Sequence, residues 1–171
     1  MFLDTFYVVK LYQLPIFVAY QIFKKLMNDI VTVLEQHDYF SIPFRIRKSN
    51  HLFVQAKINR VKGLFLIDTG ASNTCIDSSE QTFFNLLSKA HKAKASGAGA
   101  NGMHAEISVN NSIQLGKWKK NGIDIILLDL THVNIALNEY DLPKIHGIIG
   151  SDLLKSHHAI IHYPLQLLFI K

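Results

Sequence analysis

The spacing of hydrophobic and polar residues changes near His37. Before it, apolar residues recur every three to four positions, at Ile22, Leu26, Ile30 and Val33 or Leu34. This period predicts an amphipathic helix over residues 21–36. After His37, apolar and polar residues alternate or form short apolar runs, which are typical of strands. The sequence therefore predicts a helical segment, residues 1–38, followed by a mainly β domain, residues 39–171.

Within the β region, turn residues over 59–63 separate two strands and predict a hairpin. Its second strand, residues 63–67, is apolar throughout, which indicates burial on both faces. Further strands are predicted over 39–46, 51–59, 113–115, 122–130 and 159–170. Three short helices are also expected. One follows Ser78 or Ser79 and has Phe83, Phe84, Leu86, Leu87 and Ala90 inside, one runs from a capping Thr131 to Asn138, and one starts at an N-capping Ser151.

The N-terminal stretch 6–23 is apolar but is interrupted by Lys10 and Pro15. Three interpretations stay open: an upstream extension with Met27 as the natural start, a packing helix, or a membrane anchor. The acidic start and the lack of a small-residue cleavage site argue against a cleaved signal peptide. Membrane contact is therefore expected through residues 6–23 or not at all.

Composition narrows the class of protein. The chain has 171 residues, enough for one domain, and 49% of them are hydrophobic against 18% charged, which excludes overall disorder. The single cysteine, Cys75, excludes a disulfide scaffold and suits a reducing compartment, so a cytoplasmic location is expected, with membrane anchoring as the alternative. The net charge is +5, but the basic residues are scattered, so no nucleic-acid partner is expected.

The candidate chemistry begins where the buried strand 63–67 ends, at Asp68. Burying a carboxylate at the end of such a strand is costly unless neighbouring groups donate hydrogen bonds to it. The following residues, Thr69, Gly70, Ala71 and Ser72, supply hydroxyl and backbone donors and a tight turn. Much later in the chain comes a second apolar element, Gly147-Ile148-Ile149-Gly150, followed by Ser151-Asp152-Leu153-Leu154.

Together, Phe65-Leu66-Ile67-Asp68-Thr69-Gly70-Ala71-Ser72 and the later glycine-flanked element resemble the retropepsin-like aspartic proteases, especially the single-domain bacterial members. The resemblance covers residues 40–171. It implies a closed β-barrel-like fold with a glycine-rich flap over the active site. The flap candidate is Gly97, Ala98, Gly99, Ala100, Asn101 and Gly102, for which a plain flexible connector is the alternative.

Peptide hydrolysis of this kind needs two carboxylates that share one proton. The chain has one Asp-Thr-Gly, so it supplies half a site, and a homodimer that joins two Asp68 carboxylates is expected. By resemblance, Thr69 bonds between subunits, Ala71 lines the cleft, and Ser72 or Asn73 supports the loop. The sequence thus predicts an aspartic endopeptidase acting on peptides or proteins. The alternative is a catalytically silent dimerisation or peptide-binding module of the same fold.

Other chemistry-bearing residues give weaker signals. His158 and His162 would share one strand face with Ile160, and His157 is adjacent, but no acidic residue or cysteine accompanies them. We therefore expect surface histidines, no metal site and no cofactor. Cys75 is expected to be a buried structural thiol. Trp118, which lies among lysines, is expected in an exposed turn.

Overall fold

The structure is a computed structural model that describes residues 15–94 and 104–171. The chain divides into two compact units, Met1–Tyr39 and Phe40–Lys171. Each is considered by itself.

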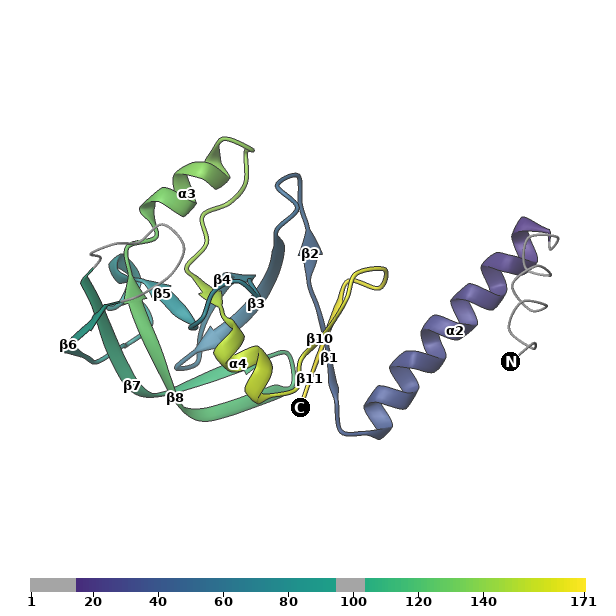
Figure 1. The fold of residues 1–171 in the computed structure, drawn as a ribbon, viewed down its shortest axis with the longest axis horizontal. Coiled ribbons are helices and arrows are strands. Elements are labelled where there is room, and N and C mark those ends of the chain that lie inside the picture. The colour runs from purple at the N-terminus through teal and green to yellow at the C-terminus, as the bar shows by residue number, and fades with distance from the viewer. Residues whose placement is uncertain (1–14, 95–103) are drawn as a thin grey trace. The chain divides into compact units, whose positions relative to one another are not determined.

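The first unit contains helix α2, Ile16–Gln36 (Figure 1). It starts directly after Pro15, whose backbone carbonyl accepts hydrogen bonds from the N–H groups of Val18 and Ala19. It ends at Gln36, with His37 as its C-cap, and the next residue, Asp38, has a left-handed φ of 67° that a helix cannot continue. The helix predicted over 21–36 is confirmed, but it begins earlier, so Met27 lies in its interior. Within the described residues, no helix is long and apolar enough to cross a bilayer.

The second unit is built from two sheets (Figure 1). The smaller has the order β1–β11–β10, and its strands are Phe40–Pro43, Leu167–Ile170 and Ile160–His162. The larger has the order β2–β3–β4–β9–β5–β8–β7–β6, and an additional β3–β7 pairing closes it on itself. Its strands are, in that order, Arg45–Ile46, Leu52–Ile58, Val61–Ile67, Gly147–Ile149, Cys75–Asp77, Trp118–Leu128, His104–Leu115 and Ser88–Lys94. The predicted mainly β, closed-barrel fold is therefore observed.

The hairpin between β3 and β4 is tighter than its sequence suggests. Asn59 and Arg60 alone form the turn, with φ of 47° and 72°, and Ile58 pairs with Val61. Two consecutive left-handed residues match the twist of the flanking strands. The Asn59 side chain also bonds outward, to the Phe84 carbonyl at 3.1 Å and the Asn111 side chain at 2.9 Å. The turn thereby ties the hairpin to two distant segments.

Three local predictions are wrong. No α-helix follows Ser78: a short 3₁₀ turn, Ser78–Glu80, capped by the Asp77 carboxylate, leads through turns into β6. Trp118 is not exposed but begins β8 in the core, with 5% of its surface accessible, because the turn before it spans only Gly116 and Lys117. The predicted strand over 159–170 is two strands, β10 and β11, paired antiparallel.

The two other helices lie where they were predicted, but their caps differ. Helix α3 spans Thr131–Asn138 and helix α4 spans Ser151–Ser156. Thr131 and Ser151 are first helical residues and not caps. The Thr131 N–H instead donates to the Asp129 carboxylate at 2.8 Å. Hydrogen bonding with Thr131 lowers the pKa of Asp129.

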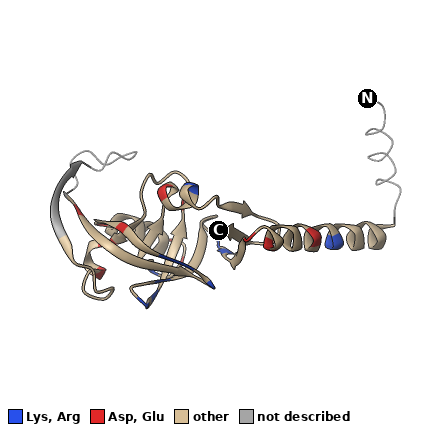
Figure 2. Ribbon diagram, turned by 90° about the horizontal axis from the view of Figure 1, so that it is seen from below, with Lys and Arg blue, Asp and Glu red and all other residues tan. Residues whose placement is uncertain are grey.

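One large hydrophobic core fills the barrel, and β4 contributes Phe65 and Ile67 to it. Its fully buried members come from strands far apart in the sequence, and a smaller cluster lies beneath α3. The largest fully buried side chains are Phe44, Phe65, Phe84, Phe169, Ile58, Ile76, Ile113, Leu115, Ile125, Leu127, Ile145 and Ile149. Charged residues, by contrast, are spread over many elements of the chain (Figure 2).

Candidate active site

Asp68 lies directly after the last residue of β4, at the point where the core ends. Its backbone N–H donates to the Ile149 carbonyl at 3.1 Å, and its carboxylate Oδ1 accepts the Gly70 N–H at 2.8 Å. The side chain is exposed. One oxygen is thus held by the tight turn after it, while the carboxyl group stays accessible to water. A fixed, accessible carboxylate is suited to proton transfer.

The two sequence motifs meet because β9 lies between β4 and β5. It runs parallel to β4, with Ile67 opposite Ile149, and antiparallel to β5, with Cys75 opposite Ile148. The chain that leaves β4 at Asp68 must therefore pass over the end of β9 before it returns as β5. The loop 68–74 and the glycine-flanked element 147–150 are brought together by this crossing.

Close backbone contact explains both glycines of the second element. A Cβ on Gly147 would lie 2.3 Å from the Cys75 carbonyl oxygen, and a Cβ on Gly150 would lie 2.4 Å from the Asn73 carbonyl carbon. Neither distance is sterically allowed. Gly150 has φ of −92° and ψ of 178°, which any residue can adopt, so space and not backbone conformation requires glycine there.

The start of helix α4 holds the loop after Asp68. The Ser151 N–H donates to the Ala71 carbonyl at 2.8 Å, and the Asp152 N–H donates to the Ser72 carbonyl at 3.3 Å. The Ser151 hydroxyl also donates to the Ser72 carbonyl, at 3.4 Å. These N–H groups would otherwise lack partners in the first turn of a helix. Ser72 therefore contributes to this contact through its backbone oxygen.

A hydrogen-bonded pair that the sequence did not reveal, buried Thr74 and half-buried Asp152, completes this support. Both the N–H and the hydroxyl of Thr74 donate to Oδ1 of Asp152 at 2.8 Å, and the Thr74 hydroxyl accepts the Gly150 N–H at 3.1 Å. Thr74 is 2% exposed. An acidic residue in the first turn of α4 was the available signal, but only the fold brings Thr74 to it.

Thr69 is exposed and lines a hollow of about 310 Å³ with Ser151, Leu154, Lys155, His158 and Ala159. The hollow lies between the loop after Asp68 and the segment that follows α4. Ala71, which follows Gly70 in the turn, is half-buried. The other predicted site residues in this turn, Asp68, Thr69, Gly70 and Ser72, are exposed.

Comparison with known proteins agrees with this geometry. A family model described as aspartyl protease matches residues 54–153, which contain both motifs. The chain belongs to the aspartyl protease family. No curated protein matches it significantly.

Two of the solved structures that match this chain share its fold as follows. A retropepsin-like aspartic protease from Rickettsia conorii aligns with a TM-score of 0.50 at 18% identity, over 77% of this chain and 89% of that one. The retroviral protease-like domain of Ddi1 from Leishmania major aligns with a TM-score of 0.50 at 20% identity, over 71% and 88%. The predicted retropepsin-like fold is thereby confirmed.

The predicted flap, residues 97–102, lies outside the residues that the structure describes. The strands on either side of it are described: β6 and β7 pair antiparallel, with Lys94 opposite His104.

The histidines and the cysteine do not form a metal site in the part of the chain that the structure describes. His158 has a left-handed φ of 50° and precedes β10, so it does not share a strand with His162. His157 packs against Trp118 with 4.9 Å between ring centroids, and the burial of its imidazole lowers its pKa.

Cys75 is 3% exposed, and burial raises the pKa of its thiol to about 12. The prediction of a buried structural thiol is confirmed.

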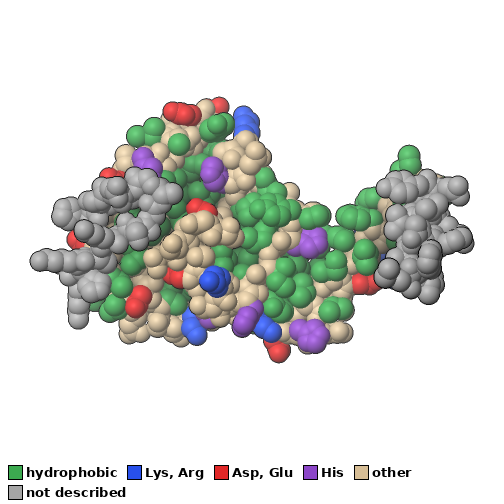
Figure 3. Space-filling model, viewed as in Figure 1, with side chains coloured by type: hydrophobic (Ala, Val, Ile, Leu, Met, Phe, Trp, Pro, Cys, Tyr) green, Lys and Arg blue, Asp and Glu red, His purple; other side chains and the backbone are tan. Residues whose placement is uncertain are grey.

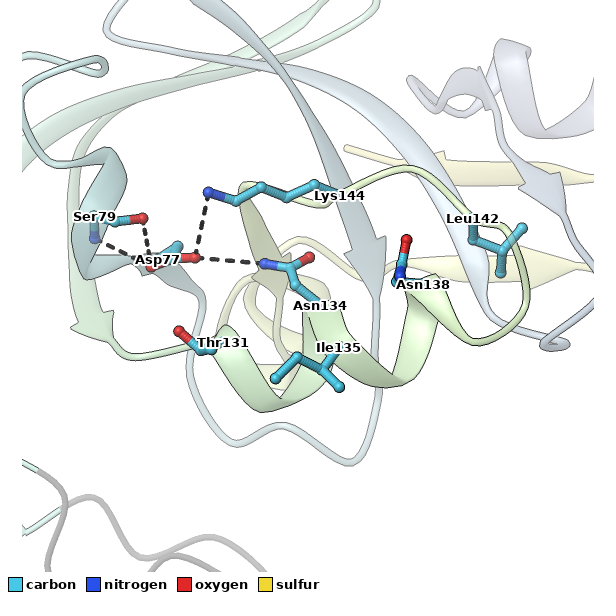
Figure 4. Close-up of a pocket in the computed structure, with 8 residues that line it drawn as sticks. All are labelled: Asp77, Ser79, Thr131, Asn134, Ile135, Asn138, Leu142 and Lys144. Atoms are coloured by element: carbon cyan, nitrogen blue, oxygen red, sulfur yellow. Dashed lines mark hydrogen bonds and ion pairs between the residues drawn. The ribbon is translucent and has the colours of Figure 1, made fainter.

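A second hollow, of about 400 Å³, lies beside α3 (Figure 4). The buried Asp77 carboxylate accepts from the Ser79 N–H at 3.1 Å and hydroxyl at 2.9 Å, and from the Asn134 amide at 3.4 Å. Lys144 lies 3.8 Å from it and bonds Glu80 at 2.7 Å, and this bond to Glu80 raises the Lys144 pKa. These groups satisfy one another, so they hold α3 against β5.

Proposed function

We propose that the protein is an aspartic endopeptidase in which two copies of the chain each contribute Asp68. The observation that carries this proposal is the position of Asp68: exposed, at the end of a core strand, and held through Oδ1 by the Gly70 N–H at 2.8 Å. Membership of the aspartyl protease family supports the reaction class. The single Asp-Thr-Gly in the sequence supports a homodimer.

In the proposed reaction, one Asp68 of the dimer is ionised and the other is protonated, because two carboxyl groups at hydrogen-bond distance share one proton. The ionised group takes a proton from water as the water oxygen attacks the peptide carbonyl carbon. The protonated group donates its proton to the carbonyl oxygen. The C–N bond then breaks as the amine nitrogen receives a proton, and the two products are a carboxylic acid and an amine. No covalent enzyme intermediate forms.

The other predicted site residues have supporting roles in this proposal. Thr69 bonds between subunits beneath the two carboxyl groups, Gly70 forms the turn, and Ala71 lines the cleft. Ser72 anchors the loop to α4 through its carbonyl. The element Gly147-Ile148-Ile149-Gly150 positions the loop from below, and residues 97–102 cover the bound peptide. Residues 39–171 form the protease domain, and residues 1–38 are an extension.

The test is cleavage of a peptide library by the wild type and by Asp68→Asn. We expect hydrolysis by the wild type and none by Asp68→Asn, with the same unfolding curve for both. Asp141→Asn is the matched control, because Asp141 is also exposed and its left-handed φ of 55° suits asparagine. Equal turnover by the wild type and Asp68→Asn would refute the assignment. A wild type that binds peptides without cleaving them would favour the silent module.

A further inference from the structure

Helix α2 carries an unbroken heptad pattern along its whole length. Its 21 residues make three heptads, and the residues at the first and fourth positions of every heptad are apolar. Their spacing alternates between three and four residues, which keeps them in one stripe along the helix. A stripe of this spacing is what one helix of a coiled coil presents to the next. The stripe, or seam, consists of Ile16, Ala19, Phe23, Leu26, Ile30 and Val33.

Large apolar side chains of the seam are exposed, although the helix has a covered side. Phe23 is 51% exposed, Leu26 54% and Val33 50%. By contrast, Met27 is buried and Leu34 is half-buried, and both lie on one flank of the seam. Within a single chain this flank is therefore covered more fully than the seam. Apolar side chains of α2 are accordingly visible at the surface (Figure 3), and contiguous apolar surface of this kind marks an interaction site.

The charge of α2 indicates what kind of partner fits the seam. The side of the helix opposite the seam is polar, and Gln21, Asn28 and Glu35 lie there one heptad apart and are exposed. Two lysines and two acidic residues give the helix a net charge of zero. An amphipathic helix that lies on an anionic membrane instead carries an excess of basic residues on its polar side. The charge and the heptad spacing together favour another helix over a membrane surface.

The proposed homodimer supplies that second helix. Only residues 37–39 join α2 to β1, the first strand of the second unit. Three residues reach at most about 10 Å, so each copy carries its helix on a short tether. Two copies that meet through Asp68 therefore hold two identical seams at a high local concentration.

We propose that α2 pairs along its seam with α2 of a second copy, as a parallel two-stranded coiled coil. In a parallel pair both tethers leave from the same end of the coiled coil, whereas in an antiparallel pair they would leave from ends about 30 Å apart. The parallel pair therefore suits two domains that meet. Each seam residue then faces its own copy across a two-fold axis, so the contact closes as a dimer. This inference rests on the proposed homodimeric function and adds a second contact between the copies.

Leu26 and Asn28 provide a matched pair of positions for a test. Leu26 lies in the middle of the seam, whereas Asn28 lies on the polar side, and both are exposed. A single helix tolerates lysine at either position, because lysine favours helices and its long side chain reaches water. In the coiled coil, Leu26→Lys alone would bring two like charges together across the seam.

The experiment measures the dimer dissociation constant of the full chain by sedimentation, for the wild type, Leu26→Lys and Asn28→Lys. We expect Leu26→Lys to raise the constant by about ten-fold or more, and Asn28→Lys to change it by less than about two-fold. As a second measurement, Phe23→Cys and Asn28→Cys are oxidised. A disulfide-linked dimer should form with Phe23→Cys only, because a seam position meets itself in a parallel pair and the native thiol, Cys75, is buried.

The results separate this inference from the proposed function. A dimer that both lysine variants weaken equally, or that neither weakens, overturns pairing through α2, even if Asp68→Asn abolishes cleavage. A dimer that Leu26→Lys alone weakens supports the pairing, even if the wild type cleaves no peptide. If Phe23→Cys forms no disulfide in such a dimer, the parallel arrangement is wrong.

Binding to vesicles of phosphatidylcholine and phosphatidylserine tests the other use of an apolar helix face. We expect the wild type and Leu26→Lys to bind these vesicles equally weakly. Vesicle binding that Leu26→Lys removes, with an unchanged dimer, would assign the seam to a membrane and overturn the pairing. A wild type that is monomeric at every concentration, while it still unfolds cooperatively, overturns both the pairing and the homodimeric function.

Discussion

The backbones of Gly150 and Asn73 are in direct contact, with no room for a side chain at Gly150. A Cβ on Gly150 would lie 2.4 Å from the Asn73 carbonyl carbon and 2.5 Å from its oxygen. The residues are far apart in sequence, and their contact is where the second motif supports the loop that carries Asp68. The geometry of the loop therefore depends on the absence of one side chain.

Gly150→Ala should destabilise the protein by about 3 kcal/mol or more and abolish cleavage, because backbone atoms must move to admit the methyl group. Gly122→Ala is the control, because its Cβ would meet nothing closer than 4.0 Å. Its left-handed φ of 70° alone should lower the free energy of unfolding, by about 1 kcal/mol. Urea unfolding measures both. Similar losses for the two variants would contradict the contact.

Removal of the Asp152 carboxylate should loosen the loop after Asp68. Asp152→Ala leaves the buried N–H and hydroxyl of Thr74 without their acceptor, which should cost about 1–3 kcal/mol. Asp152→Asn keeps an oxygen at the same place and should cost less. Urea unfolding and cleavage rates are measured together. If asparagine is as damaging as alanine, hydrogen bonding to Thr74 is not what Asp152 provides.

Specific activity should fall on dilution. Because one chain carries one Asp-Thr-Gly, a monomer holds half of the proposed site. The rate should therefore depend more steeply than linearly on protein concentration below the dimer dissociation constant. Cleavage assays over a dilution series, with sedimentation at the same concentrations, measure this. Constant specific activity in a monomeric sample would refute the half-site.

Cleavage should pass through a maximum as pH rises. The proposed reaction needs one protonated and one ionised carboxyl group, so the rate falls when both are protonated and again when both are ionised. The two apparent pKa values that the profile gives belong to the pair of Asp68 carboxyl groups and not to either one alone. Initial rates on one peptide across the pH range give the profile. A rate that still rises at about pH 9 would indicate a different nucleophile or a metal-based reaction.

The Cys75 thiol should be unreactive until the protein unfolds. Its pKa is raised by burial from 9.0 to about 12, so the folded state keeps the proton that the unfolded state loses. The stabilisation is complete below pH 9.0 and is lost as pH rises towards 12. The difference in unfolding free energy between the wild type and Cys75→Ala should therefore narrow over that range. A constant difference, or rapid labelling of the native thiol, would contradict this account.

The local pattern of the sequence was sufficient for several elements. The three-to-four-residue period predicted the helix that ends at Gln36, and the apolar run before Asp68 predicted a buried strand. Helix α3 and the start of α4 were also placed to within one residue, because their predicted caps are the first helical residues. These features depend on which residues lie within a few positions of one another, and that information is contained in any short window of sequence.

Other features depend on contacts across the chain. Phe84 and Leu86 suggested a helix, but the segment that holds them forms turns and irregular backbone. Both side chains belong to the barrel core, and the Asn59 side-chain amide donates to the Phe84 carbonyl. Trp118 is surrounded by lysines in sequence and by core residues in space. The tertiary environment outweighs local propensity at these positions.

The sequence by itself determined where the proposed half-site residue lies: Asp68 follows an apolar strand and precedes Thr69 and Gly70, and the structure has a strand end and a tight turn there. Only the tertiary structure decided what holds it in place. The insertion of β9 between β4 and β5, and the Thr74–Asp152 pair, join segments whose separation in sequence carries no periodic signal. Such pairings are selected by the packing of the whole core, which no short stretch of the chain contains.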